Sequence, residues 1–144
     1  MTRTQRIKRI VDLADVTRRE ASQQIASTRQ AHEENLARLE QFRRYRAEYA
    51  QSLGVGEPGM SAARARELRL FIEQLERTIE ALGRQTERSE RQCGDAIGRW
   101  QQAARRSDAL GEILDRSASD AARLADGRDQ REIDDRHRCR DDEG

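Results

Sequence analysis

Two long stretches of the chain repeat their apolar positions every seven residues, and this pattern predicts two helices. In the first stretch, one series of positions reads Ile7, Ala14, Ala21, Thr28, Asn35, Phe42 and Tyr49. A second, interleaved series reads Val11, Arg18, Ile25, His32, Leu39, Arg46 and Leu53. Spacings that alternate between four and three residues are typical of the narrow seam of a coiled coil. The pattern therefore predicts a first helix over about residues 4–53.

The second stretch keeps the same period for longer. One of its series reads Ala65, Ile72, Ile79, Thr86, Cys93, Trp100, Ser107, Leu114 and Ala121. Its companion reads Leu68, Leu75, Leu82, Ser89, Ala96, Ala103, Leu110, Ser117 and Leu124. These series predict a second helix over about residues 61–135, followed by a polar tail over residues 136–144.

The segment between the two stretches, "LGVGEPGMS" at residues 53–61, carries the signals of a turn. Gly54 suits the left-handed position that ends a helix, Pro58 cannot continue one, and Ser61 can cap the next. We expect a turn over residues 54–60 that is centred near Glu57. Residues whose numbers add up to about 114 would then face one another in an antiparallel pair.

The predicted fold is all-α: a long antiparallel two-helix coiled-coil hairpin, forming a single domain over residues 1–144. In the expected register Phe42 faces Ile72 and Trp100 faces Ala14. The C-terminal part of the second helix overhangs, so that several apolar residues lack a partner within the chain: Leu110, Ile113, Leu114 and Leu124. Each glycine inside the second helix costs about 1 kcal/mol relative to alanine, namely Gly83, Gly94, Gly98 and Gly111.

Composition agrees with a narrow seam and limits the possible functions. The chain is 35% hydrophobic and 38% charged, which favours long helices or disorder over a wide globular core, and the periodicity favours helices. Its net charge is only +1, so that a general nucleic-acid or lipid-surface binder is not indicated. No apolar run approaches the roughly 20 residues that cross a bilayer. The start "MTRTQRIKRIVDLADV" lacks the apolar core of a secretory signal, so we expect a cytoplasmic protein without membrane insertion.

Candidate chemistry is sparse. Cys93 and Cys139 form no CxxC pair, and His137 with Cys139 gives too few ligands for zinc. His32 falls at a seam position, where a packed histidine is the expected interpretation. Phosphate loops, nucleophile elbows and zinc-binding helices have no counterpart in the sequence, and a two-helix hairpin offers no pocket in which to desolvate a reacting group. We therefore expect no catalytic residues, no metal and no cofactor.

The aromatic residues are the most distinctive feature. The stretch "QFRRYRAEYAQSL", residues 41–53, contains Phe42, Tyr45 and Tyr49 in a chain with only 3% aromatic residues. Phe42 and Tyr49 belong to the seam, whereas Tyr45 and Phe71 each lie one residue before a seam position. These two rings are expected to emerge on the flanks as a binding surface, or to close over the seam as intramolecular covers.

Four segments resemble one family. The run Tyr45-Arg46-Ala47-Glu48-Tyr49 resembles the YxxEY segment of the FliJ family, and Phe71-Ile72 with Leu75 and Ile79 resembles its FIxxLxxxI segment. Trp100, followed by Leu110, Asp115 and Arg116, is similar to its tryptophan-to-LxxxxDR stretch. "DQREIDD", residues 129–135, resembles its QKxxDE ending. The matches occur in order over about residues 7–135.

The resemblance implies a component of the bacterial flagellar type III export apparatus, cytoplasmic and peripherally associated with its inner-membrane parts. Such proteins are antiparallel coiled coils similar to the rotor stalk of rotary ATPases. The implied partners are the hexameric export ATPase (FliI), the export gate protein (FlhA) and export chaperones. Gate contacts would correspond to Phe42, Tyr45, Tyr49, Phe71 and Leu75. ATPase contacts would involve the terminal regions, for which we name Arg6, Lys8, Arg9, Leu110 and Leu114.

Two alternatives remain from the sequence. One is the equivalent stalk of a virulence-type injectisome, which shares the fold and differs in its substrates. The other is a generic coiled-coil scaffold that associates weakly with itself. Arg6, Lys8 and Arg9 could contact an acidic partner or only be solvated, and the residues alone favour neither.

Overall fold

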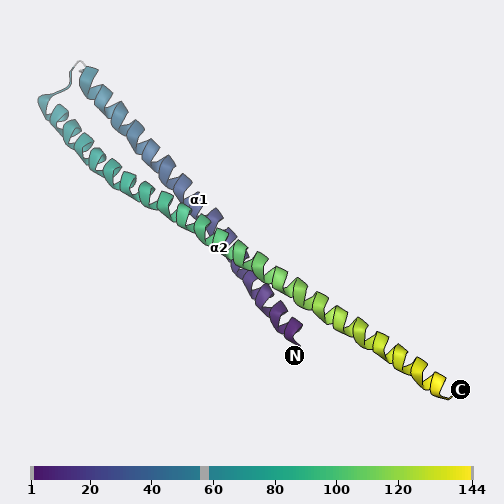
Figure 1. Cartoon of the computed structure of the whole chain (residues 1–144). Coiled ribbons are helices and arrows are strands. Elements are labelled where there is room, and N and C mark those ends of the chain that lie inside the picture. The colour runs from purple at the N-terminus through teal and green to yellow at the C-terminus, as the bar shows by residue number, and fades with distance from the viewer. Residues whose placement is uncertain (1, 56–58, 144) are drawn as a thin grey trace. The chain divides into compact units, whose positions relative to one another are not determined.

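The computed structural model describes residues 2–55 and 59–143, and nearly all of them lie in two helices (Figure 1). Helix α1 spans Arg3–Val55 and helix α2 spans Ala62–Asp142. Within the described ranges no residue forms a strand, and the helices pack against each other as an antiparallel hairpin. The predicted all-α hairpin is confirmed. Neither helix, over its described residues, contains a stretch apolar enough to cross a membrane.

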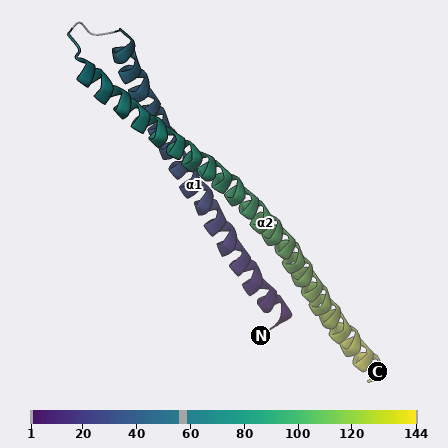
Figure 2. The ribbon, with the colours of Figure 1, turned by 90° about the vertical axis from the view of Figure 1, so that its left-hand side faces the viewer.

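The contacts between the helices divide into two compact units. Unit 1 consists of Met1–Glu20 and Gln101–Gly144, and unit 2 consists of Ala21–Trp100. In each unit a segment of α1 runs antiparallel to a segment of α2 (Figure 2). A single domain over residues 1–144 stays a prediction.

The seam lies where the heptad pattern predicts it. In the described chain, every buried residue occupies one of the predicted seam positions. The buried hydrophobic residues are Ala14, Leu39, Leu68, Leu75, Leu82 and Ala96. The buried polar residues are Thr86, Ser89 and Ser107. Burying this stripe of small and medium side chains is the main force that holds two otherwise highly charged helices together.

The predicted register between the helices is wrong by one heptad. The numbers of the residues that meet across the seam add up to between 120 and 122, and not to about 114. These pairs are Thr4 with Ser117, Asp15 with Ser107, His32 with Ser89, Arg46 with Glu76, and Tyr49 with Phe71.

The error has a simple physical cause. A slip of seven residues leaves seam positions opposite seam positions, so that the apolar pattern alone does not choose between the two registers. In the observed register Phe42 is level with Ile79, and Trp100 is level with Ala21 instead of Ala14. Polar residues at the seam distinguish the registers, because the observed one places Ser89 opposite His32 and Ser107 opposite Asp15, where these side chains hydrogen-bond.

The ends of the helices next to the turn follow the predicted chemistry in part. Ser61 caps α2, since the backbone N–H of Arg64 donates to its Oγ at 3.1 Å. Gly54 does not terminate α1, which continues through Val55. The left-handed glycine is Gly59, with φ of 96°. The predicted turn centre at Glu57, like Pro58, lies outside the described residues.

The start of α1 carries a cap that the sequence analysis did not identify. The backbone N–H of Gln5 donates to the hydroxyl of Thr2 at 3.2 Å, and the backbone N–H of Thr2 donates to Gln5 Oε1 at 3.0 Å. This reciprocal pair is a capping box, with the pattern Thr-x-x-Gln. It stabilises the first turn of α1, and the hydroxyl of Thr4 in that turn lies 3.0 Å from the hydroxyl of Ser117 on α2.

The overhang of α2 begins one heptad later than expected. Leu110 and Leu114 are half-buried and level with Val11 and Ile7, so the expectation that they lack a partner in this chain is wrong. From Ala118 to Glu143 every side chain is exposed. In Figure 1 the yellow end of α2 extends beyond the N-terminus, and no other described segment runs beside it.

The predicted end of the second helix near residue 135 is wrong as well. Helix α2 continues through residues 136–142, the predicted polar tail, and ends at Asp142. The stretch from Arg128 to Glu143 contains neither glycine nor proline. Opposite charges also stand four residues apart there, as in Glu132 and Arg136 or Asp134 and Arg138. Such pairs stabilise a helix by a few tenths of a kcal/mol each, about 0.2–0.5 kcal/mol.

Candidate partner-binding surfaces

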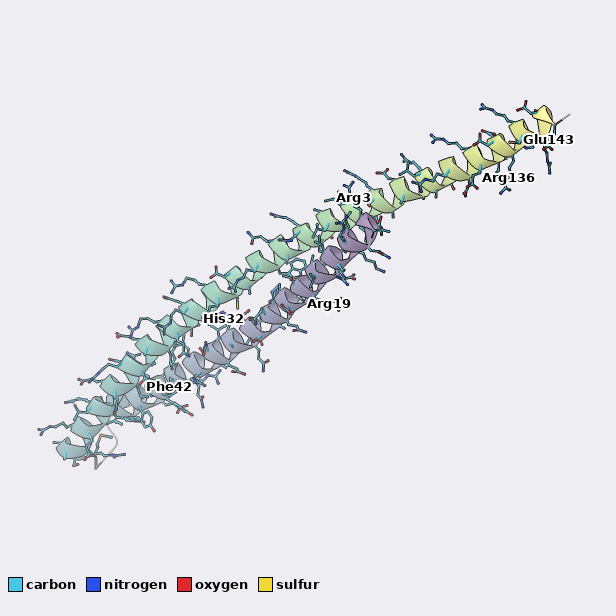
Figure 3. The ribbon with its side chains drawn as sticks, turned by 90° about the horizontal axis from the view of Figure 1, so that it is seen from below. Arg3, Arg19, His32, Phe42, Arg136 and Glu143 are labelled. Atoms are coloured by element: carbon cyan, nitrogen blue, oxygen red, sulfur yellow. The ribbon has the colours of Figure 1, made fainter. Side chains whose placement is uncertain are left out.

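A groove in unit 2 gathers the aromatic residues of both helices, and we call it the ring groove. Residues 42, 45 and 49 of α1 are three and four apart and therefore share one face of that helix. The groove has a volume of about 410 Å³ and is lined by Phe42, Tyr45, Tyr49, Phe71, Gln74, Leu75 and Thr78. All five residues predicted to contact an export gate are among them. Figure 3 shows Phe42 in this part of the hairpin.

The rings pack edge to face in two pairs. The centroids of Phe42 and Tyr45 are 5.9 Å apart at an interplanar angle of 71°. Tyr49 and Phe71 join the two helices, with centroids 4.9 Å apart and an angle of 83°. Edge-to-face pairs contribute roughly 0.5–1.5 kcal/mol beyond the area they bury, so the groove wall is held in shape by its own rings.

The rings remain accessible in spite of this packing. Tyr45 is 39% exposed, Tyr49 is 38% exposed and Phe71 is 42% exposed. The expectation that Tyr45 and Phe71 emerge on the flanks is confirmed. The expectation that Tyr49 closes the seam is wrong, because its ring is as open as that of Tyr45. The ring of Tyr49 packs against that of Phe71 on α2. The tyrosine hydroxyl of Tyr45 accepts a hydrogen bond from Gln41 Nε2 at 2.8 Å.

Charge is absent from the described lining of the ring groove. Nearby along both helices, Arg46 and Glu76 form an ion pair across the hairpin, with Nη2 and Nε at 3.0 and 3.1 Å from the same carboxylate oxygen. Both side chains are about half exposed, so that the pair contributes at most about 1 kcal/mol. The pair gives Arg46, which occupies a seam position, an acidic partner, and neither side chain lines the ring groove.

A polar layer interrupts the seam in the middle of unit 2, around His32 (Figure 3). Ser89 Oγ lies 2.8 Å from the carbonyl oxygen of Thr86 and 2.7 Å from His32 Nδ1, so it hydrogen-bonds both within α2 and across the seam. Every buried side-chain nitrogen and oxygen in the described chain has a partner. His32 is thus a packed seam residue, as expected.

The five residues predicted to contact an ATPase do not form one surface. Arg6, Lys8 and Arg9 are exposed in unit 1, while Leu110 and Leu114 are half-buried in its seam. Residues seven apart share a face of a coiled coil, which places the three basic residues on three different faces of α1. Arg6 shares a face with Leu13, Lys8 with Asp15, and Arg9 with Val16.

On the overhang, α2 alone forms a groove of about 560 Å³ whose lining includes Ile133, Arg136 and Arg140. Two further grooves in unit 1, which both helices line, were not predicted. One, of about 430 Å³, is lined by Ile10, Leu13, Ala14, Thr17, Ala103 and Arg106. The other, of about 730 Å³, lies where α1 begins, and its lining includes Arg3, Ile113, Arg116 and Leu124. Ile10 and Leu13 lie three residues apart and off the seam, which is the sequence signal that could have identified this flank.

The described residues contain no cluster of three or more histidine, cysteine, aspartate or glutamate side chains arranged to hold a metal ion. Cys93 is half-buried in the seam and Cys139 is exposed on the overhang, and both are free thiols. The arrangements that remain as candidate sites are the three grooves that both helices line. Their chemistry suits contacts with another macromolecule.

Comparison with known proteins gives one match. A family model described as "Flagellar FliJ protein" matches residues 3–139. The matched range includes all of α1 and nearly all of α2. No curated protein and no solved structure matches the chain.

Proposed function

The chain belongs to the flagellar FliJ protein family, and on that premise we propose that it is the stalk-like component of the bacterial flagellar type III export apparatus. In this role it performs no chemistry of its own. It links the export ATPase (FliI) to the export gate protein (FlhA) and handles export chaperones. It acts in the cytoplasm, at the periphery of the inner-membrane part of the apparatus.

The observation that carries this proposal is the ring groove. Five residues from two helices, named from resemblance alone, line one open groove in unit 2: Phe42, Tyr45, Tyr49, Phe71 and Leu75. Three of its aromatic rings, Tyr45, Tyr49 and Phe71, are each more than a third exposed. Exposed aromatic clusters of this kind mark protein–protein contacts, where aromatic side chains supply a large share of the binding energy.

The geometry of the groove suits a folded protein partner. Its wall is prepared before binding, because the edge-to-face contacts already restrict Tyr45, Tyr49 and Phe71. Little side-chain entropy is then lost on association, which favours affinity. The neutral lining also means that an apolar side chain of the partner can enter without stranding a charge.

The alternatives from the sequence now differ in support. The family match is to a flagellar protein, which supports the flagellar system over an injectisome. A generic self-associating scaffold predicts dimers and no binding to export components. The oligomeric state of the purified chain and its binding to the ATPase and the gate therefore test that alternative directly.

The decisive experiment measures binding of the chain to the cytoplasmic region of the gate protein. We expect Tyr45→Ala and Phe71→Ala each to weaken binding by about tenfold or more, since each removes a groove wall. Helicity, followed by circular dichroism, should stay nearly unchanged for both variants. Phe42→Ala should weaken binding and also lower stability, because Phe42 is half-buried at a seam position.

Leu70 provides a matched control. It precedes Phe71 in α2, is 59% exposed and lies outside the lining of the ring groove. Leu70→Ala should leave binding unchanged. Equal losses for Leu70→Ala and Tyr45→Ala would argue against a specific groove, and a large loss of helicity in Tyr45→Ala would show that its ring serves the hairpin instead of a partner.

A further inference from the structure

The two grooves of unit 1 combine exposed apolar side chains with positive charge. The charged residues in their lining are Arg3, Arg106, Arg116, Arg128 and Asp120, which are four arginines against one aspartate. The exposed large apolar residues in the same lining are Ile10, Leu13, Ile113 and Leu124. A chain with a net charge of only +1 thus concentrates basic groups around an apolar strip.

Both grooves lie on one flank of the seam, which we call the basic flank. Ile10 and Thr17 border the row of seam positions that contains Ala14, and Ala14 lines the same groove. On α2, Arg106 and Ile113 are seven residues apart and so share a face, with Arg106 in the first groove and Ile113 in the second. The second groove then continues onto the open seam of the overhang at Leu124.

The opposite flank of unit 1 is different. Asp15 borders the seam row of Arg18, and its carboxylate accepts a hydrogen bond from the hydroxyl of Ser107 at 2.5 Å. Arg18 Nη1 lies 3.7 Å from Asp108 Oδ1. Asp15, Arg18 and Asp108 are therefore engaged within the hairpin. By contrast, none of the described arginines in the two grooves forms an ion pair.

From this asymmetry we infer that the basic flank is the surface through which unit 1 docks a protein partner, and that the partner presents acidic groups around apolar side chains. Arginines placed around an apolar strip complement such a surface in both charge and hydrophobicity. The inference rests on the proposed function for the identity of the partner, the export ATPase. It adds which side of the hairpin faces the ATPase and the chemistry of the ATPase surface.

The set of contact residues changes accordingly. Of the five residues named from the sequence, only Arg6 shares a face with the basic flank, through its position one heptad before Leu13. Lys8 and Arg9 lie on other faces, and Leu110 and Leu114 already pack in the seam. The contacts on the basic flank are instead expected from Ile10, Leu13, Arg106, Ile113 and Arg116.

The test measures the affinity of the full chain for the purified ATPase hexamer. The double variant Arg106→Glu, Arg116→Glu reverses two charges in the grooves. Its control, Arg19→Glu with Arg105→Glu, makes the same change of net charge on faces outside the grooves. We expect the first pair to weaken binding by about tenfold or more and the control to change it by less than about twofold.

A second pair of variants tests the apolar part. Leu13→Ser with Ile113→Ser removes two exposed side chains of the basic flank, and Val16→Ser with Leu36→Ser removes two exposed side chains that line none of the grooves. Only the first pair should weaken binding, again by about tenfold. All four double variants alter exposed positions, so helicity equal to that of the wild type is the control for folding.

The outcomes separate the two proposals. If the wild-type chain does not bind the ATPase, the proposed function fails and the inference fails with it. If the wild type binds and the basic-flank variants bind equally well, the function stands and the inference is overturned. The inference is also overturned if these variants lose binding to vesicles containing anionic lipid while they retain the ATPase, because the basic flank would then face a membrane.

Discussion

Among the described residues, unit 2 buries Leu39, Leu68, Leu75, Leu82 and Ala96, whereas the only buried hydrophobic residue of unit 1 is Ala14. The accessible grooves of the two units also differ, in their charge. Between its helices unit 2 has one groove with a neutral aromatic lining, whereas the two grooves between the helices of unit 1 are lined by four arginines and one aspartate in total. The same heptad pattern therefore builds a more apolar seam in one unit and a more charged docking flank in the other. Variants and conditions that act on the two units unequally test this comparison.

The largest expected difference is in stability. Leu82→Ala removes a side chain that is 8% exposed in the seam of unit 2, and should lower the free energy of unfolding by about 2–3 kcal/mol. Leu124→Ala, at a seam-row position of unit 1 that is 65% exposed, should cost less than about 0.5 kcal/mol. Urea denaturation followed by circular dichroism measures both. Equal losses would contradict the assignment of the stabilising seam to unit 2.

The next largest difference is expected in how ionic strength affects the affinities of the two binding surfaces. Raising ionic strength from about 50 to about 200 mM should weaken ATPase binding through the basic flank by about tenfold, because exposed charges are screened. Binding of the gate through the neutral ring groove should change by less than about threefold over the same range. Isothermal titrations at both ionic strengths give the comparison, and a reversed order of salt sensitivity would refute it.

A smaller effect is expected from the polar layer. Ser89→Ala leaves His32 Nδ1 without its partner at a position where Ser89 itself is only 3% exposed, and should cost about 1 kcal/mol. Ser107→Ala in unit 1 should cost less, because Asp15 is only half-buried and water can replace the lost hydrogen bond. The free energies of unfolding of the two variants decide this order.

The smallest effect concerns the glycines of α2. A Cβ added at Gly94 or Gly127 would meet no atom within 4 Å. Gly94→Ala in unit 2 should therefore stabilise the hairpin by about 0.5–1 kcal/mol, which is the difference in helix propensity. Gly127→Ala, in the overhang, should raise helicity with almost no change in the midpoint of unfolding, because that segment packs against nothing in the described chain. A shift of the midpoint by Gly127→Ala would contradict this picture.

Much of the fold could be predicted from the sequence, because the heptad period specifies which face of each helix is buried. The period could not specify the register, since a slip of one heptad preserves every apolar match. The pairs His32 with Ser89 and Asp15 with Ser107 contain that information, but only once side chains are placed opposite one another. Similarly, the sequence suggested Gly54 as the left-handed residue, whereas the described residue with a left-handed backbone is Gly59.

Of the two candidate binding surfaces, one could be predicted from the sequence and the other could not. The ring groove could be predicted because its residues stand in short, distinctive segments on two helices. The basic flank could not, because its parts are far apart in the sequence: Ile10 and Leu13 near the start, Arg106 and Ile113 about a hundred residues later. Only the register brings them together, and the register predicted from the sequence was shifted. The shifted register also left Leu110 and Leu114 without a partner in the hairpin, which is why they were predicted to contact another protein.

The central claim is that one chain carries two separate docking surfaces, and simultaneous binding tests it most directly. The affinity of the gate's cytoplasmic region should be measured for the chain alone and for the chain saturated with the ATPase hexamer. The account predicts a three-component complex and two dissociation constants that agree within about twofold, because the surfaces share no residue. Displacement of the gate fragment by the ATPase would contradict it.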